Sequence, residues 1–341
     1  KRLGQQIKSS WKEVDLFCLT KFKGNKKYEE RIIYFDSSLR KLTADLFHQY
    51  DNIIYIMSLG IVVRVIAPYL ESKKVDPAVV TIDETGENVI STLSGHLGGA
   101  NRLTEKLARA LNSNPVITTA TDCQNKPAID LLAQKMNCAI KPFSNLKLAN
   151  SAIVNDRQVN IFSDYKLPLI EGENIDIYSL SHLNDKLAEN TFPVIVSNKN
   201  YSFKKEYLQL IPRNITVGIG CRRGIEKEKI AGAITKALQK VNLEEESIKR
   251  LATIDLKADE PGLLAYAEEK NLILDIIERE KIKNADLGNI SYSEFVKNAV
   301  GVPGVCEPAA LLSSNEGKLI LSKSKYDQVT IALVEEEIEI D

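Results

Sequence analysis

The segment Ser94–Asn101 (SGHLGGAN) places three glycines and a histidine directly before a helical pattern. Free backbone amides at the start of a helix attract anions, so the segment predicts a cradle for an anionic group of a substrate. His96 is a candidate general base or metal-facing group, because imidazole titrates near neutrality. A structural turn with a hydrogen-bonded histidine is the alternative. The predicted substrate-binding residues of this segment are Ser94, Gly95, Gly98, Gly99 and Asn101.

The glycine spacing of this segment differs from the common phosphate-binding and nucleophile motifs. It is neither G-x-x-x-x-G-K-S/T nor G-x-G-x-x-G. Thr92 stands where the nucleophile elbow G-x-S-x-G requires glycine, so Ser94 is predicted to be a turn residue and not a nucleophile.

Asp122 is the candidate partner of His96. It follows Thr118-Thr119-Ala120-Thr121, which we expect at the carboxyl end of a strand Val116–Ala120. Asp122 can orient His96 or act as a base itself. Capping of the predicted helix Ile129–Met136 explains it equally well.

Two further segments combine glycine with arginine. In Ser58–Arg64, Gly60 permits a tight turn and Arg64 can bind a carboxylate through two nitrogens; a capped core helix with a solvated arginine is the alternative. In Gly218–Gly224, Gly220 precedes Arg222 and Arg223, a pair suited to carboxylates or phosphates unless it is merely solvated.

The segment Gly218–Gly224 resembles a dinucleotide loop but is one residue too long. No acidic residue ends the next strand at the distance of about 20 residues that NAD binding requires. Cys221 inside it is interpreted as a small buried residue, although a helix amino terminus can lower the pKa of a thiol.

Two acidic segments are expected to face this last loop. Strand alternation puts Asp255, Lys257 and Asp259 on one side, with Glu260 next to them. Glu307 precedes a proline that starts a helix. Catalysis by Glu307 and substrate binding by Asp259 and Glu260 are the functional predictions; helix capping is the alternative.

The elements that must position these residues follow an alternation of apolar runs and helical patterns. This alternation predicts an α/β protein with two parallel-sheet domains, 1–137 and 213–341, that carry helices on both faces. A smaller, irregular α/β region, 138–212, separates them. The predicted helices are Leu103–Leu111, Ile129–Met136, Glu226–Val241 and one that starts at Pro261. The predicted strands are Val14–Leu19, Ile32–Phe35, Ile53–Met57, Ala78–Ile82, Val89–Thr92, Val116–Ala120, Ile153–Phe162, Phe192–Val196, Thr216–Ile219, Leu251–Leu256, Leu272–Ile277, Lys318–Leu321 and Val329–Val334.

The composition argues against several classes of partner. A formal net charge of −1 gives no global field for nucleic acid, and no apolar run is long enough to span a bilayer. Five widely spaced cysteines form no C-x-x-C pair, which argues against a zinc site and for a reducing compartment. No leader-like segment opens the chain, so a cytoplasmic location is expected.

Long motifs in the chain resemble the cobalamin biosynthesis protein G (CbiG) family, the cobalt-precorrin-5A hydrolases. The amino-terminal resemblance rests on Ser58–Arg64, Val75–Val80, Leu93–Asn101 and Pro115–Asp122. The carboxy-terminal resemblance rests on Val217–Gly224, Ala252–Leu263 and Glu307–Leu311. Cys306 stands where the family leads us to expect alanine, so the resemblance implies no catalytic role for this thiol.

The resemblance implies a specific reaction and substrate. Water opens a lactone on a cobalt-bearing, ring-contracted tetrapyrrole, and the extruded two-carbon unit leaves as acetaldehyde to give cobalt-precorrin-5B. Cobalt then arrives with the substrate, so we expect no cofactor and no metal site in the protein. His96 would be the base, oriented by Asp122, and the Gly98 and Gly99 amides would stabilise the oxyanion.

Other partners and functions follow from the same reading. A homodimer and transient contacts with neighbouring pathway methyltransferases are expected partners. A corrinoid carrier without catalysis and a nucleotide-dependent enzyme that uses Gly218–Gly224 are the alternative functions.

Overall fold

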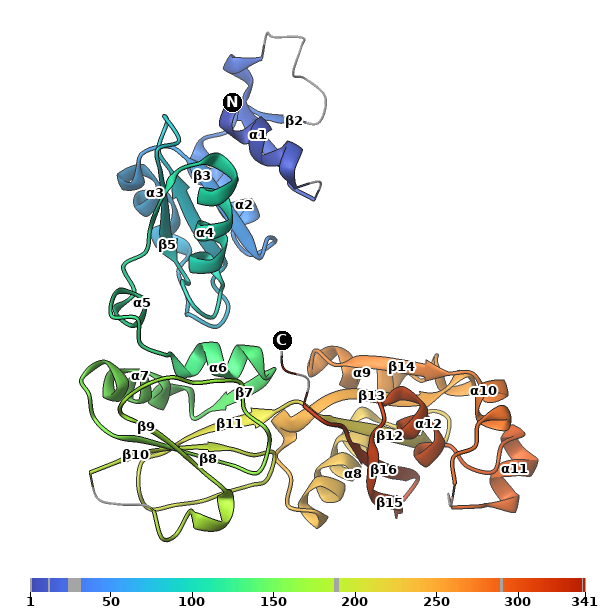
Figure 1. Cartoon of the computed structure of the whole chain (residues 1–341). Helices are drawn as coiled ribbons and strands as arrows, with labels where there is room; N and C mark the ends of the chain where they lie inside the picture. Colours follow the sequence, from blue (N-terminus) through green and yellow to red (C-terminus); the bar gives the residue numbers. More distant parts are fainter. Residues whose placement is uncertain are drawn as a thin grey trace. The chain divides into compact units, whose positions relative to one another are not determined.

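A computed structural model describes residues 2–11, 13–23, 32–186, 190–288, 291–338 and 340 of the chain. The chain divides into two compact units, Lys1–Leu131 and Leu132–Asp341. The first unit runs from blue to green in Figure 1 and the second from green to red. The second unit holds two sheets, so the predicted middle region and carboxy-terminal domain fold as neighbours within one unit.

A four-stranded sheet in the order β3-β4-β5-β6 forms the centre of the first unit. Its strands are β3 (Asn52–Ile56), β4 (Ala78–Ile82), β5 (Asn88–Leu93) and β6 (Asn114–Val116). β3 pairs with β4, and β5 with β6, in parallel, whereas β4 and β5 are antiparallel. The sheet is therefore mixed, whereas a wholly parallel sheet was predicted.

A short turn explains the antiparallel pair. Only Asp83–Glu87 separates β4 from β5, too few residues for the crossover that parallel strands require. The Asp83 carboxylate accepts the backbone N–H groups of Gly86 at 2.7 Å and Asn88 at 2.7 Å, which closes the turn. The carboxyl end of β5 consequently lies beside the start of β4, where Leu93 pairs with Val79.

Helices cover both faces of this sheet, as predicted. α1 (Arg2–Ser10) and α4 (Ala100–Leu111) bury Ile7, Ala100 and Leu107 against β4 and β5. α2 (Leu39–Leu46) and α3 (Leu59–Ile66) lie on the other face, where Val62 and Ile66 join the second core. The two remaining strands of the unit, β1 (Leu16–Leu19) and β2 (Ile32–Phe35), form a separate parallel pair. Two short 3-10 helices complete the unit: η1 (Thr20–Phe22) follows β1, and η3 (Ala67–Tyr69) follows α3.

The predicted strand Val116–Ala120 is wrong beyond its first residue. β6 ends at Val116, and residues Ala120–Cys123 form the short helix α5 with Thr119 as its N-cap. β6 is an edge strand paired with β5 alone, so its β-branched continuation has no second partner to keep it in the sheet. α6 (Ile129–Lys135) follows, close to the predicted helix Ile129–Met136.

The middle region is more regular than predicted. Its five strands, in the order β7-β11-β10-β8-β9, are parallel except for β7, and α7 (Leu146–Val154) packs on the sheet. The strands are β7 (Cys138–Lys141), β8 (Val159–Ser163), β9 (Ile175–Tyr178), β10 (Phe192–Val196) and β11 (Leu208–Pro212), and the 3-10 turns are η4 (Phe143–Asn145) and η5 (Leu180–His182). The predicted strand Ile153–Phe162 is wrong at its start, because Ala149, Ala152 and Ile153 are buried at helical spacing in α7.

The carboxy-terminal sheet has the order β14-β13-β12-β16-β15. Its strands are β12 (Ile215–Cys221), β13 (Ile248–Ile254), β14 (Ile273–Ile277), β15 (Lys318–Tyr326) and β16 (Val329–Glu335). β12, β13 and β14 are parallel, and the hairpin β15–β16 joins antiparallel to β12. The α/β class is confirmed, with mixed sheets.

The helices of this part occupy both faces of the sheet. α8 (Lys227–Lys240) and α9 (Pro261–Glu269) pack their apolar residues on one face, while α12 (Cys306–Ser313) contacts β12 and β13. The remaining elements are α10 (Arg279–Asn284), α11 (Glu294–Val300), η6 (Glu245–Ser247) and η7 (Asp255–Lys257). The predicted helices Glu226–Val241 and the one starting at Pro261 are confirmed.

Polar contacts join the middle and carboxy-terminal sheets within the second unit. The Glu335 carboxylate accepts hydrogen bonds from Tyr165 Oη at 2.9 Å and from Asn198 Nδ2 at 2.7 Å. Lys141 Nζ donates to Glu244 Oε2 at 2.8 Å. These contacts explain why the chain does not separate into compact parts near residue 213.

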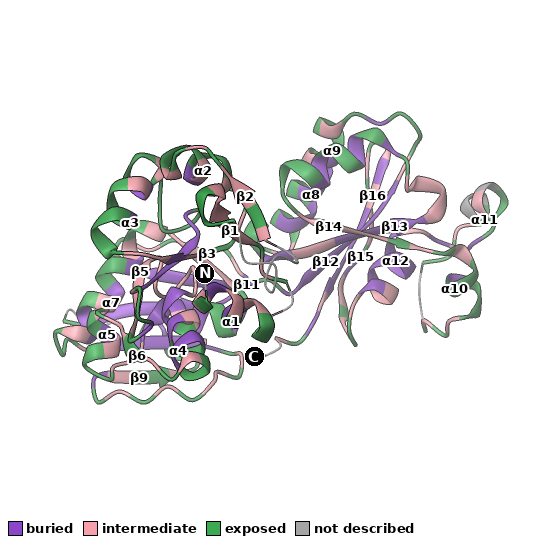
Figure 2. Ribbon diagram, turned by 90° about the horizontal axis from the view of Figure 1, so that it is seen from above, coloured by how far each residue is buried: buried purple, intermediate pink, exposed green. Residues whose placement is uncertain are grey.

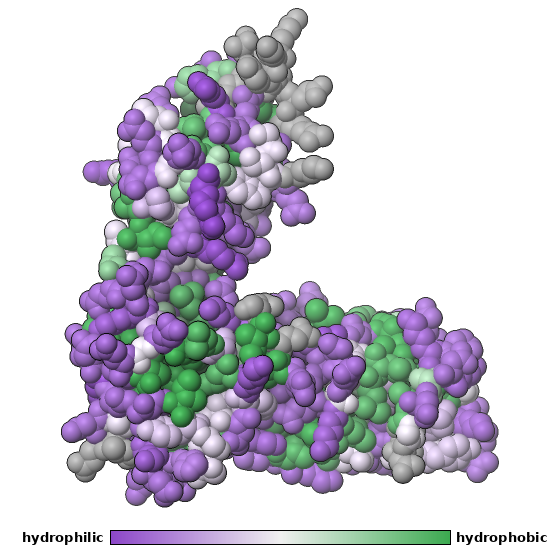
Figure 3. Space-filling model, in the orientation of Figure 1, coloured by the Kyte–Doolittle hydropathy of each residue, from purple (hydrophilic) through white to green (hydrophobic). Residues whose placement is uncertain are grey.

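Apolar side chains are concentrated inside both units. Figure 2 shows β12, β13 and β16 largely in the colour of buried residues and the outward helix faces in that of exposed ones. Figure 3 shows a largely hydrophilic visible surface with separate hydrophobic patches. Within the part of the chain that the structure describes, no helix is long and apolar enough to cross a membrane.

Candidate active site

The loop between β5 and α4 brings His96 to the edge of the first sheet. Ser94 has a left-handed φ of 56°, and its Oγ donates to the Asp76 carbonyl at 3.1 Å, which fits the predicted turn residue. Gly99 caps α4 with a φ of 84°, a conformation that costs glycine little. The loop therefore turns sharply and places His96 just before the helix.

Most amides of the predicted cradle are used inside the loop. Gly99 N donates to the His96 carbonyl at 2.9 Å, Ala100 N to the Ser94 carbonyl at 3.1 Å, and Asn101 N to the Gly95 carbonyl at 3.0 Å. The expectation that Gly99 donates to an oxyanion is therefore corrected. The Gly98 N–H makes no hydrogen bond within the described residues and remains the candidate donor.

His96 lies between two carboxylates. Its Nε2 is 2.6 Å from Asp122 Oδ2, and its Nδ1 is 3.1 Å from Asp130 Oδ2. Only 8% of the His96 side chain is exposed. A neutral imidazole has one N–H, so it can donate to only one of these carboxylates, whereas the imidazolium donates to both.

The charge state of His96 follows from the same contacts. Burial alone lowers the pKa of His96, but hydrogen bonds and charge from Asp130, and then from Asp122, outweigh it and raise the pKa to about 9. His96 is consequently protonated at neutral pH. This charge state argues against the predicted role of His96 as the general base, because an imidazolium has no lone pair with which to accept a proton.

Asp122 is the exposed member of the cluster. Its side chain is 33% exposed, against 9% for Asp130. Asp122 Oδ2 accepts from His96 and also from Asn101 Nδ2 at 3.1 Å, while Asp122 Oδ1 has no hydrogen-bond partner within the described residues. One carboxylate oxygen is thus held in place and the other is available to solvent.

Asn101 supports this arrangement and does not face a ligand. It is 7% exposed. Its Oδ1 accepts from Ser91 Oγ at 2.6 Å, and its Nδ2 donates to Thr119 Oγ1 at 2.9 Å as well as to Asp122. The predicted substrate-binding role of Asn101 is corrected, because both ends of its amide are already engaged by the protein.

Asp130 was missed by the sequence reasoning. It lies in the first turn of α6, where an acidic residue is ordinarily explained by the helix dipole. The available signal was an acidic residue at a helix start soon after a candidate active-site aspartate. Nothing in the local pattern shows that this side chain reaches back 34 positions to His96.

Gly60 lies at the opposite edge of the sheet from His96. Gly60 is the second residue of α3, which follows β3, whose carboxyl end is beside Ile82, whereas Ser94 follows the antiparallel β5. The two glycine segments therefore lie at opposite strand ends of the sheet and do not share one site. Arg64 is exposed in the last turn of α3, and its role in substrate binding stays a prediction.

Gly218 and Gly220 lie in a buried strand and not in a loop. A Cβ at Gly218 would come within 1.8 Å of the Cys306 carbonyl of α12, so glycine is required for this helix to pack on β12. The Gly220 carbonyl accepts from Thr330 Oγ1 at 3.1 Å. Gly220 therefore has a packing role in place of the predicted substrate contact. The nucleotide-binding alternative requires Gly218 and Gly220 in a loop, and both lie in a strand.

Neither cysteine near this strand is activated. Burial raises the pKa of the Cys221 thiol to about 11 and that of the Cys306 thiol to about 11. Both thiols are therefore protonated at neutral pH. The interpretation of Cys221 as a small buried residue fits this environment.

Asp259 and Glu260 face the loop beyond β12, as expected, and both are engaged there by the protein. Arg223 Nη1 lies 3.0 Å from Asp259 Oδ2 in an exposed ion pair. Glu260 is buried, and its Oε1 accepts the N–H groups of Gly224 at 2.7 Å and Ile225 at 3.1 Å. Arg222 and Arg223 are both exposed, and their roles as substrate contacts stay predictions.

Glu307 has a structural environment. It is 2% exposed, and its Oε1 accepts from Ser291 Oγ at 2.9 Å and from Lys323 N at 2.6 Å. Its other oxygen accepts from Ser291 N. Because both carboxylate oxygens hold other segments of the unit, the expectation that Glu307 is catalytic is corrected to a structural role.

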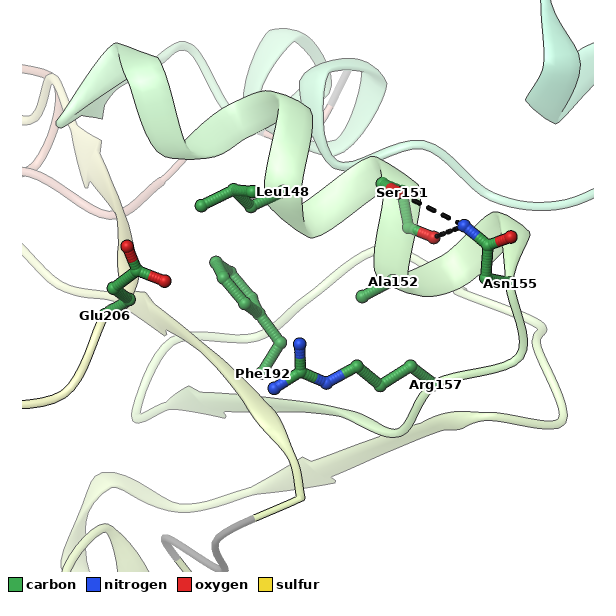
Figure 4. A pocket seen from close by; sticks show the side chains of 7 residues that line it. All are labelled: Leu148, Ser151, Ala152, Asn155, Arg157, Phe192 and Glu206. Carbon is green, nitrogen blue, oxygen red and sulfur yellow. Dashed lines mark hydrogen bonds between the residues drawn. The ribbon is translucent and has the colours of Figure 1, made fainter.

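A small cavity of about 260 Å³ lies in the middle region (Figure 4). Its lining residues are Leu148, Ser151, Ala152, Asn155, Arg157, Phe192 and Glu206. Pockets for drug-sized ligands occupy about 300–1,000 Å³, so a tetrapyrrole is too large for it. Asn155 Nδ2 is also engaged by the Ser151 carbonyl at 2.8 Å, and we assign this cavity no role.

No candidate metal centre accompanies the cluster. Across the described ranges, no group of three or more histidine, cysteine, aspartate or glutamate side chains could hold a metal ion. The arrangement at His96 consists of two carboxylates and one imidazole ring at the end of a strand of an α/β sheet.

The fold is an α/β fold with the His96 cluster at the end of a strand of its first sheet, and comparison with known proteins gives the family. The cobalamin synthesis G N-terminal, central-region and C-terminus family models match residues 41–122, 127–212 and 215–334. The chain belongs to the cobalamin biosynthesis protein G family.

Full-length relatives agree with this assignment. The chain is 34% identical over 338 residues to the cobalt-precorrin-5A hydrolase of Priestia megaterium, covering 95% of this chain and 88% of that protein. It is 35% identical over 320 residues to the cobalt-precorrin-5A hydrolase of Salmonella typhimurium, covering 92% and 90%. A crystal structure of a cobalamin biosynthesis protein G homologue from Sulfolobus solfataricus matches with a TM-score of 0.36 and 26% identity, over 92% of this chain and 90% of that one.

Proposed function

We propose that this protein is a cobalt-precorrin-5A hydrolase of cobalamin biosynthesis that uses the His96 cluster. The activity follows from relatives of that name, which match about nine-tenths of the chain at 34% and 35% identity. The observation that carries the site is the partly exposed Asp122 carboxylate, held by His96 at 2.6 Å. It supplies the base that lactone hydrolysis requires.

The reaction has two balanced steps. In the first, water bonds through its oxygen to the lactone carbonyl carbon and the ring C–O bond breaks, which leaves a carboxyl group and a hydroxyl group. In the second, that hydroxyl loses its proton and the adjoining C–C bond breaks. The electron pair stays with the conjugated macrocycle, which takes up a proton, and acetaldehyde leaves.

The substrate carries its own cobalt and several carboxylates. We propose that the protein therefore works without a resident cofactor, and that Arg64 and Arg222 bind substrate carboxylates. The five cysteines are free thiols in the structure, as suits the cytoplasm proposed for the reaction. The homodimer and the contacts with pathway methyltransferases stay predictions from the sequence.

Acetaldehyde release tests the function directly. The purified protein is incubated anaerobically with cobalt-precorrin-5A, and acetaldehyde is measured through NADH oxidation by alcohol dehydrogenase. We expect one acetaldehyde for each cobalt-precorrin-5B formed. Tight binding of the substrate without aldehyde would instead indicate a carrier. A thermal shift with NAD(P) or ATP would revive the nucleotide-dependent alternative.

A further inference from the structure

We infer that Asp122 is the catalytic base of this site and that Asp130 is a positioning residue that acts on Asp122 through His96. The inference rests on the proposed function and assigns roles within its site. It reverses the order of a catalytic triad in which histidine takes the proton and aspartate orients it.

Access to solvent separates the two carboxylates. The Asp122 side chain is 33% exposed and has one oxygen without a partner in the described residues, so a water or a lactone can reach it. The Asp130 side chain is 9% exposed and faces His96 Nδ1 at 3.1 Å. Asp122 can therefore contact the substrate, whereas Asp130 acts behind the imidazole.

The hydrogen bonds of His96 determine how Asp130 acts. Both ring nitrogens have a carboxylate partner, and an imidazolium with a proton on each nitrogen donates to both carboxylates at once. The imidazolium then fixes Asp122 Oδ2 by a charge-assisted hydrogen bond, and Asn101 Nδ2 adds a second donor at 3.1 Å. Removing the Asp130 charge weakens the tendency of His96 to stay protonated and thereby loosens Asp122.

Charged and polar side chains from α4, α5 and α6 surround the imidazole of His96. Asp122 from α5 and Asp130 from the start of α6 are the charged side chains that most affect the ring. Thr121 Oγ1 lies 3.3 Å from Nε2, and the neutral Asn101 of α4 contacts Asp122. Burial lowers the pKa of His96, but the contacts with Asp130 and Asp122 outweigh it and raise the pKa to about 9, so its titration is expected on the alkaline limb of a rate profile.

The assigned step balances in protons. Asp122 takes one proton from the attacking water as the oxygen–carbon bond forms. When the ring C–O bond breaks, Asp122 returns this proton to the leaving alkoxide. His96 stays protonated throughout, so it neither gains nor loses a proton over the cycle.

Three variants test the roles in the full-length protein. Asp122→Asn keeps the hydrogen-bond acceptor but removes the base, and should lower kcat by about 10²–10⁴-fold with little change in KM. Asp130→Asn should lower kcat by about 10–100-fold, the range typical of residues that orient a functional ligand from behind. Asp83→Asn is the matched control: this carboxylate closes the β4–β5 turn at the opposite sheet edge, so its loss should affect stability and leave kcat unchanged.

A pH profile distinguishes positioning from a merely structural effect. In the wild type, kcat should fall as the pH rises through about 9, when His96 loses its proton. In Asp130→Asn the alkaline limb should move to lower pH, because one of the two charges that hold the proton is gone. An unshifted limb and an unchanged kcat, with only a lower melting temperature, would overturn the assignment of Asp130.

Nitrogen NMR of the histidines gives a test without substrate. The chain has three histidines, so His96→Gln identifies the relevant signal. At pH 7.5 both nitrogens of His96 should be protonated in the wild type, and a single protonated nitrogen would overturn the inference. If the wild type releases no acetaldehyde, the proposed function fails, while this measurement still decides the charge state. If the wild type is active and Asp122→Asn keeps its rate, the inference fails and the function stands.

Discussion

Two glycine-bearing segments, Ser94–Asn101 in the first unit and Gly218–Gly224 in the second, have similar small and polar residues but different surroundings. After Ser94 the chain leaves β5 and turns, which places His96 and Asp122 at a sheet edge. Gly218 instead lies inside β12, where the backbone of α12 packs against it. The difference teaches that glycine next to a polar residue indicates close backbone approach, and that only the surrounding fold decides whether the approaching group is a ligand or a helix.

The carboxylates of the two regions differ in the same way. Glu307 and Glu260 are buried, and each accepts backbone N–H groups of other segments. Asp122 uses one oxygen within the protein and leaves the other exposed. A carboxylate with an exposed free oxygen can take a proton from a substrate, whereas Glu307, which is buried and has both oxygens bonded, mainly holds the fold together.

The largest expected effect compares His96→Gln with Glu307→Gln. His96→Gln removes the cation between two carboxylates and should lower the turnover of acetaldehyde release by about 10²–10⁴-fold. Glu307→Gln places an amide where three hydrogens were accepted, and should cost about 1–3 kcal/mol of stability while folded protein keeps its turnover. Turnover is measured per folded molecule. If Glu307→Gln lost turnover and His96→Gln kept it, Glu307 and not His96 would belong to the active site.

A smaller effect is expected at Gly218. Gly218→Ala forces a Cβ into the Cys306 carbonyl and should lower the free energy of unfolding of the second unit by about 1–3 kcal/mol, measured by urea denaturation. Gly232→Ala is the control, because a Cβ there meets nothing within 4 Å in the middle of α8. It should stabilise by about 0.4–1 kcal/mol. Equal effects of the two substitutions would contradict the packing role.

The smallest effect is expected at the exposed ion pair of the second unit. Arg223→Ala removes the partner of Asp259, but the side chains are 63% and 69% exposed, so water screens the pair. The melting temperature should stay close to that of the wild type in low and high salt. If acetaldehyde release nevertheless becomes slower at low substrate concentration only, Arg223 binds a substrate carboxylate as the sequence predicts. Both glycine-bearing segments would then contact the substrate.

Several parts of the molecule could be predicted because they depend on local pattern. The buried strands Ala78–Ile82 and Phe192–Val196 and the helix from Lys227 follow directly from apolar periodicity. His96 and Asp122 were paired by residue type, and the structure brings them to 2.6 Å. The middle sheet was underestimated because its helix and strand lie only four residues apart, so one apolar run was taken for a strand.

The sequence alone determined the α/β class, the order of the elements and the segment that carries the histidine, because periodicity and residue type are local properties. Tertiary structure decided the rest. The antiparallel pairing of β5 put Ser94 and Gly60 at opposite edges of the sheet. The start of α6 brought Asp130 to His96 across 34 positions, which turned a presumed base into a cation and made Asp122 the exposed carboxylate. Charge state and access depend on neighbours in space, and no spacing along the chain encodes which neighbours those are.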